Sequence, residues 1–172
     1  MLRCVRADGS ATWQKQTDRH AAFFALHDLT HFAVETTLGY RRGFFGLISE
    51  GWDIEDTTGK GARGPLPPEA AEVEGVVGLF DAERAGGQIW TVAEFNEFAA
   101  MKGARTLTFD EIARIKNKRS DLFQQWSAVV PGETLELQFD VADEACPARP
   151  YGACTGTRLT VSVFSSLTRL KK

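Results

Sequence analysis

The chain has 172 residues, of which 43% are hydrophobic and 25% charged, and its formal net charge is −3 at pH 7. A chain of this length can bury a sizeable core, and we expect a single domain over residues 1–172. The small negative charge argues against nucleic acid as a partner. The sequence has no apolar run of transmembrane length, and its first residues, MLRCVRADGS, lack the apolar core of a signal peptide. We therefore expect a cytoplasmic protein that binds neither nucleic acid nor a membrane.

The first predicted elements are two short strands and a helix. Residues 2–6 and 12–16 read as strands around the turn ADGS. Thr17 or Asp18 can cap a helix that then runs without Pro or Gly until Gly39, a suitable residue for its C-terminal cap. This helix is apolar on most of its circumference, which is typical of a buried helix.

The middle of the chain predicts further helices. The apolar segment YRRGFFGLISEGWDI indicates a helix that ends near Gly51, and the Gly- and Pro-rich run TTGKGARGPLPP after it predicts a mobile loop. Three more helices are expected, beginning near Pro68, at Thr91 and at Thr108 or Asp110.

The last elements are strands with one apolar face. In ETLELQFDV (133–141) and TRLTVSVF (157–164), apolar residues alternate with polar ones, as in an antiparallel sheet covered on one side. Strands, then helices, then strands is the order expected of the α+β class. We predict helices packed on one face of a small antiparallel sheet formed by the N- and C-terminal strands.

All three histidines of the chain lie on the first predicted helix. The stretch HDLTHFAVE, residues 27–35, holds His27 and His31 four residues apart, and His20 lies seven residues upstream. At about 100° per residue the three side chains share one narrow stripe of the helix. Residues four apart lie roughly 6 Å apart, so His27 and His31 can converge on one ion, whereas His20 is about 10 Å along the axis from His27.

Burial of this helix makes a partner for its polar groups necessary, because an unpaired polar group in a protein interior costs several kcal/mol. A divalent cation, most simply zinc, would satisfy the histidine pair. The alternative is that the histidines are structural and are satisfied by one another, by backbone carbonyls and by Glu35.

The segment HDLTH resembles the zinc-peptidase signature HExxH. Glu50 follows His31 after eighteen residues, and this spacing resembles that of gluzincin metallopeptidases of the M1 aminopeptidase type. The resemblance implies that His27, His31 and Glu50 are metal ligands and that Asp28 occupies the position of the general base. Asp28 is one methylene shorter than the glutamate of that family.

Two other resemblances are carried by the same segment. HDLTH is similar to the HDxxH motif of Coq4-type proteins of ubiquinone biosynthesis, although the glutamate of that pattern falls on Gly43 here. The longer segment HDLTHFAVETTLGYRRGFFGLISEGWDI resembles a group of bacterial proteins without an assigned activity. The resemblance to Coq4-type proteins implies at most a related style of metal site.

The third ligand stays open at this point. Glu50 has the peptidase spacing and is favoured, whereas Glu35, one turn beyond His31, is an alternative ligand or a partner that orients His31. His20 is a further candidate in the same cleft. We expect a divalent-metal-binding protein, specifically a metal-dependent hydrolase with Asp28 as base, acting on an unknown small molecule or peptide. The rival hypothesis is a non-catalytic binding module.

Overall fold

The computed structural model describes residues 1–15, 21–141 and 157–165 and has the α+β architecture that the sequence predicts. Five α-helices, a short 3-10 helix and four strands lie within these ranges. In chain order they are β1 (Leu2–Arg6), β2 (Ala11–Gln14), α1 (Ala21–Leu38), α2 (Phe44–Ser49), η1 (Ile54–Thr58), α3 (Pro68–Gly86), α4 (Val92–Met101), α5 (Phe109–Ala128), β3 (Thr134–Val141) and β4 (Thr157–Phe164).

The four strands form one antiparallel sheet in the order β2-β1-β4-β3, so the first and last strands of the chain are neighbours at its centre. Cys4 pairs with Val161, and Leu137 pairs with the same residue from the other side. This register aligns the apolar residues of the strands on one face, where Phe139 and Leu159 are also buried. The predicted alternation and the joining of the two chain ends are confirmed.

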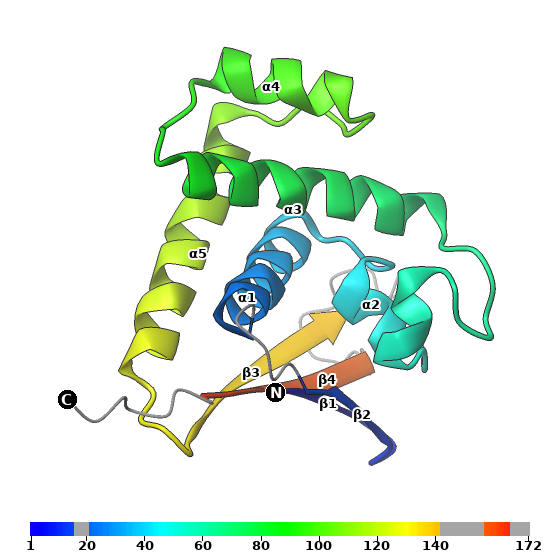
Figure 1. Ribbon diagram of the computed structural model, residues 1–172. Coiled ribbons are helices and arrows are strands. Elements are labelled where there is room, and N and C mark those ends of the chain that lie inside the picture. The colour runs from blue at the N-terminus through cyan, green and yellow to red at the C-terminus, as the bar shows by residue number, and fades with distance from the viewer. Residues whose placement is uncertain (16–20, 142–156, 166–172) are drawn as a thin grey trace, which may run out of the picture.

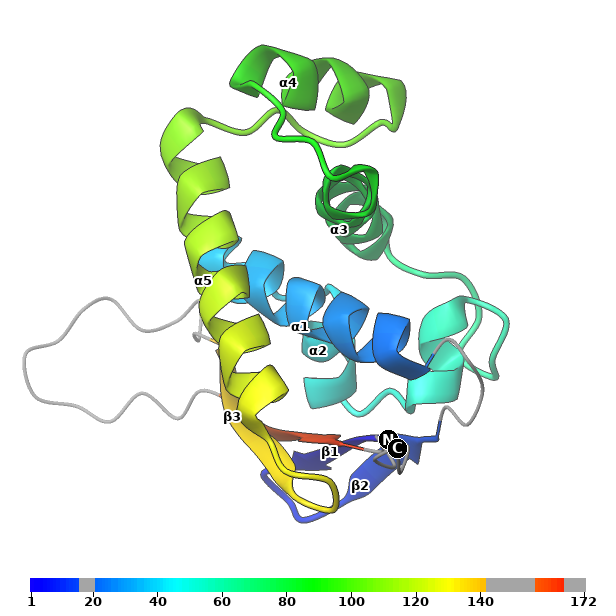
Figure 2. The same ribbon diagram turned by 60° about the vertical axis from the view of Figure 1, so that its left-hand side comes forward.

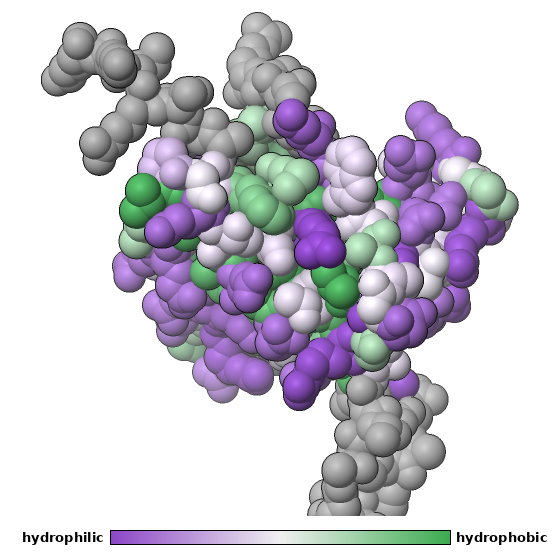
Figure 3. Space-filling view, turned by 90° about the horizontal axis from the view of Figure 1, so that it is seen from below, coloured by the Kyte–Doolittle hydropathy of each residue, from purple (hydrophilic) through white to green (hydrophobic). Residues whose placement is uncertain are grey.

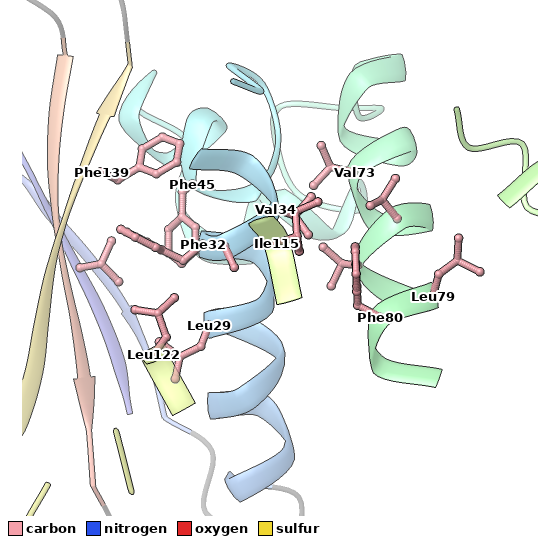
Figure 4. Close-up of a cluster of buried hydrophobic side chains, with 14 of the residues drawn as sticks. Leu29, Phe32, Val34, Phe45, Val73, Leu79, Phe80, Ile115, Leu122 and Phe139 are labelled. Atoms are coloured by element: carbon pink, nitrogen blue, oxygen red, sulfur yellow. The ribbon is translucent and has the colours of Figure 1, made fainter. Parts of the chain in front are cut away.

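Helix α1 lies at the centre of the molecule, between the sheet and the outer helices α3 and α5 (Figures 1 and 2). Phe32 of α1 packs against Phe45 of α2 and Phe139 of β3, with ring centroids about 6 Å apart. Figure 4 shows Val34 of the same helix on the side toward α3. A helix with partners on opposite sides needs apolar residues on most of its circumference, which explains the apolar composition of α1.

The helix boundaries follow from local capping chemistry. Thr91 and Thr108 each accept a hydrogen bond from the backbone of the third helical residue, whose glutamate bonds back to the threonine, so both are capping boxes. Gly39 follows α1 with φ of 72°, a left-handed conformation that glycine adopts without strain. The predicted caps Thr17 and Asp18 lie outside the described residues.

The segment predicted as a mobile loop is in part regular structure. Its first residues, Thr57 and Thr58, belong to η1. Beyond η1, the backbone N–H of Ala62 donates a hydrogen bond to the Asp56 carboxylate. The Arg63 side chain donates to the carbonyl of Gly51 at 2.7 Å. Arg63 also lies over the ring of Trp52. The glycines of this segment therefore serve a folded turn that is anchored to the end of α2.

Figure 3 views the molecule from below, where the sheet lies in Figure 1. Hydrophilic residues cover much of this surface, with smaller hydrophobic areas between them. Among the residues that the structure describes, no helix is both long and apolar enough to cross a membrane.

Candidate metal centre

Two of the three histidines come together on α1. The rings of His27 and His31 have centroids 4.8 Å apart and are nearly perpendicular. His31 is 1% exposed, whereas the side chain of His27 retains 23% of its exposure. Phe23 stacks on His27 and Phe44 packs against His31, so aromatic rings flank the pair. The pair thus has a closed end at His31 and an end that solvent reaches at His27.

A carboxylate holds the Nδ1 atom of each ring. Asp81 Oδ2 of α3 lies 2.8 Å from His27 Nδ1, and Glu35 Oε1 lies 3.1 Å from His31 Nδ1. A carboxylate at one ring nitrogen fixes the orientation of an imidazole and leaves its other nitrogen for a ligand. In both residues that other nitrogen is Nε2. The contact expected between Glu35 and His31 is present.

Glu74 of α3 completes a group of three candidate ligands. Its Oε1 atom lies 3.2 Å from His31 Nε2, but the two are poorly aligned, and Nε2 is buried without a hydrogen bond in the described part of the chain. His27, His31 and Glu74 each offer one ligand atom, and these atoms lie within 4.8 Å of one another. Two ligand atoms of a tetrahedral zinc site are separated by about 3.3 Å, given zinc–ligand bonds of about 2.0–2.1 Å. We call these three residues the histidine–glutamate group.

Glu35 is fixed by the start of α2. It is fully buried, and its Oε2 atom accepts hydrogen bonds from the backbone N–H groups of Phe45 (3.0 Å) and Gly46 (3.2 Å). A Cβ atom at Gly43 would lie 2.5 Å from Glu35 Cδ, so only glycine leaves room for this carboxylate. Gly43 is also the position at which the Coq4-like pattern has a glutamate. In this chain the Glu35 side chain fills the space beside Gly43.

The charges around the histidine–glutamate group are balanced in pairs. Burial disfavours a charged His31, but its contacts with Glu35 and Glu74 outweigh burial and raise the pKa of His31 to about 10. Burial also opposes ionisation of Glu74 and Asp81, yet the facing histidines hold the pKa of both carboxyls below the usual value. The arrangement therefore keeps ionised carboxylates on both imidazoles near neutral pH.

Asp28 is buried beside the pair rather than within the histidine–glutamate group. Burial raises the pKa of Asp28 to about 7, although the charges of His31 and His27 act in the opposite direction. Burial, and next the charge of Asp28, raise the pKa of the Cys4 thiol on β1 to about 12. Cys4 is thus a packing residue of the sheet, without the thiolate character that a nucleophile requires.

The structure does not bring Glu50 to the histidines. Glu50 caps the C-terminus of α2, is exposed, and pairs with Arg42 at 3.1 Å. His20 lies outside the described residues. Sequence reasoning missed Glu74 and Asp81, which come from a helix more than forty residues further along the chain. The one sequence signal for them is their spacing of seven residues, two helical turns, which places both on one face of α3.

Compared with known proteins, the chain matches no protein-family model, no curated protein and no solved structure at a significant level.

Proposed function

We propose that the protein binds a divalent metal ion through His27, His31 and Glu74, with Asp81 and Glu35 orienting the two imidazoles. The observation that carries the proposal is the buried Nε2 atom of His31, which has no hydrogen bond in the described part of the chain and lies 3.2 Å from the Glu74 carboxylate. A buried polar atom without a hydrogen bond is uncommon in native proteins and calls for an explanation. An ion between Nε2 and Oε1 would supply one.

The composition of the group supports zinc or a similar borderline metal. Two imidazoles and one carboxylate form a donor set typical of catalytic zinc sites, which keep a fourth position for water or substrate. Glu74 retains 51% of its side-chain exposure, so the site is open on the side of α3. When bound in such a site, zinc lowers the pKa of its water to about 7, which is the basis for proposing a metal-dependent hydrolase. Asp28 is the candidate base, and the substrate is an unknown small molecule or peptide.

Metal content and titration calorimetry on purified protein test the proposal. Wild type is expected to bind one equivalent of Zn²⁺, and Glu74→Gln and His27→Ala are expected to weaken binding about 100-fold or more, because each removes a ligand. Asp81→Asn should weaken binding about 10- to 100-fold, since it acts through the orientation of His27. Any metal-dependent hydrolysis should fall in the same variants.

Glu50→Gln is the matched control for Glu74→Gln. It removes a charge of the same kind from an exposed ion pair, and we expect it to retain zinc. Loss of zinc in Glu50→Gln with full binding in Glu74→Gln would show that the peptidase-like spacing identifies the ligand. A wild-type protein that binds none of Zn²⁺, Mn²⁺, Ni²⁺ and Fe²⁺ would overturn the proposal and favour the rival hypothesis of a non-catalytic binding module whose helix histidines are structural.

A further inference from the structure

A pocket that is open to solvent lies between α3 and α5, outside the histidine–glutamate group. Its volume is about 400 Å³, within the range of small-molecule sites. Arg84 of α3 lines it together with residues 116, 119, 120, 123, 124 and 127 of α5. The spacing of the α5 residues, three or four apart, makes them one continuous stripe of that helix. No acidic residue is among the described residues that line the cavity.

We propose that this cavity binds a small organic anion through its phosphate or carboxylate group, with Arg119 and Arg84 as the recognising cations. Both guanidinium groups are already positioned by the same aromatic ring. The Cζ atoms of Arg84 and Arg119 lie 6.0 Å and 5.8 Å from the centroid of Phe123. Planar guanidinium groups held on a ring lose little freedom when they bind an anion, which favours recognition of phosphate and carboxylate.

Arg119 has a charge that the surrounding side chains leave without an ion pair. One of its N–H groups donates to the neutral carbonyl of Phe80 at 2.8 Å, and no ion pair links it to an acidic residue in the described ranges. Its two cationic neighbours are partly neutralised, since Arg84 pairs with Asp81 and Lys116 with Glu83. The guanidinium is half-buried, and burial lowers the pKa of Arg119, while the nearby charges of Glu83 and Asp81 raise it and that of Arg84 lowers it again. An anion bound directly to the guanidinium would offset the remaining cost of its burial.

The remaining lining groups also suit an oxyanion. The Nε atom of Arg84 is buried and donates to no acceptor within the described residues. The hydroxyl group of Ser120 and the side-chain amide of Gln124 add hydrogen-bond donors at the wall, whereas the Ser127 hydroxyl donates to the backbone carbonyl of Gln124 at 2.8 Å. The net charge of −3 argues against an extended polyanion, which needs a broad basic surface rather than one concave site. A small ligand therefore fits better than a nucleic acid.

Asp81 connects this cavity to the histidine–glutamate group. Its Oδ1 atom lies 3.3 Å from Arg84, while its Oδ2 atom lies 2.8 Å from His27. The Asp81 carboxylate would thus stand between an anion bound to Arg84 and His27, a candidate metal ligand. Anion binding does not require the metal, and the two proposals are tested separately.

Calorimetric titration of the full chain with inorganic phosphate, and in a parallel arm with succinate, tests the inference. Saturable binding of phosphate, of succinate or of both is expected, and the two arms tell which anion class is preferred. Gln124→Glu places a negative charge at the wall and should weaken binding about tenfold by Coulomb repulsion. Gln125→Glu introduces the same charge on the neighbouring residue of α5, which does not line the cavity, and should change the affinity less than twofold.

Two further variants complete the design. Arg119→Gln should abolish binding, and far-ultraviolet circular dichroism would confirm that it is folded. Glu74→Gln should bind the anion as wild type does, even if it has lost zinc, which separates failure of this inference from failure of the metal proposal. Absence of saturable binding at millimolar phosphate and succinate, or an equal loss of affinity in Gln124→Glu and Gln125→Glu, would overturn it.

Discussion

Glu35→Ala is expected to destabilise the metal-free protein by about 3–5 kcal/mol, the cost of removing one partner of a buried charged pair. The carboxylate is fully buried, contacts His31 Nδ1 and accepts hydrogen bonds from two backbone N–H groups of α2. Its removal leaves these donors without an acceptor in the interior, at about 1–3 kcal/mol for each unsatisfied group. The loss is large against a typical total stability of about 5–15 kcal/mol.

Urea unfolding after removal of metal by chelation measures this loss as a shift of the transition midpoint. Glu50→Ala is the control, because Glu50 forms an exposed ion pair with Arg42 whose removal should cost about 0.5 kcal/mol or less. Glu35→Gln retains an acceptor for the α2 backbone and should fall between the two. Equal midpoints for Glu35→Ala and Glu50→Ala would contradict the role assigned to the buried carboxylate.

Gly46→Ala is expected to destabilise the protein by about 3 kcal/mol, at the upper end of what overpacking usually costs. A Cβ atom at Gly46 would lie 2.0 Å from the carbonyl oxygen of Arg41, which is a backbone atom and cannot rotate away. To relieve this overlap, α2 must move relative to the turn that precedes it. The same movement would withdraw the N–H group of Gly46 from Glu35.

Gly78→Ala provides a control of opposite sign. Gly78 is exposed in the middle of α3, and a Cβ atom there would have no neighbour within 4 Å. Because glycine is a poor helix former, alanine should stabilise this site by about 0.5–1 kcal/mol. Thermal unfolding of the two variants should therefore shift the midpoint in opposite directions. A lower midpoint in both would mean that Gly46 is not distinguished by its contact with Arg41.

The sequence predicted well those elements whose structure depends on residues close together in the chain. Thr91 and Thr108 mark helix starts because each has a glutamate three residues later, and Gly39 marks the end of α1. The strands were recognisable because a sheet covered on one side requires alternation with period two. The proximity of His27 and His31 also follows from local geometry, since residues four apart meet on any α-helix.

The parts of the site that sequence did not predict depend on how helices pack. Glu74 lies in AEVEGVV, a segment of an amphipathic helix in which a glutamate is expected on the exposed face, and nothing local indicates that Glu74 meets His31. Only the packing of α3 against α1 brings Glu74 and Asp81 to the histidines. The peptidase-like spacing instead favoured Glu50. A motif match does not show whether the C-terminal end of the short helix α2, where Glu50 lies, faces the histidines or solvent.

The origin of the three candidate ligands on two helices has a consequence for folding. His27 and His31 belong to α1, and Glu74 belongs to α3. An ion held by all three would be a cross-link that closes the intervening chain into a loop, so its binding free energy would add to the folding free energy. At a metal concentration 1,000 times the dissociation constant, the gain would be about 4.1 kcal/mol. The melting temperature would then report metal occupancy, and chelation would lower it by much less in Glu74→Gln than in wild type.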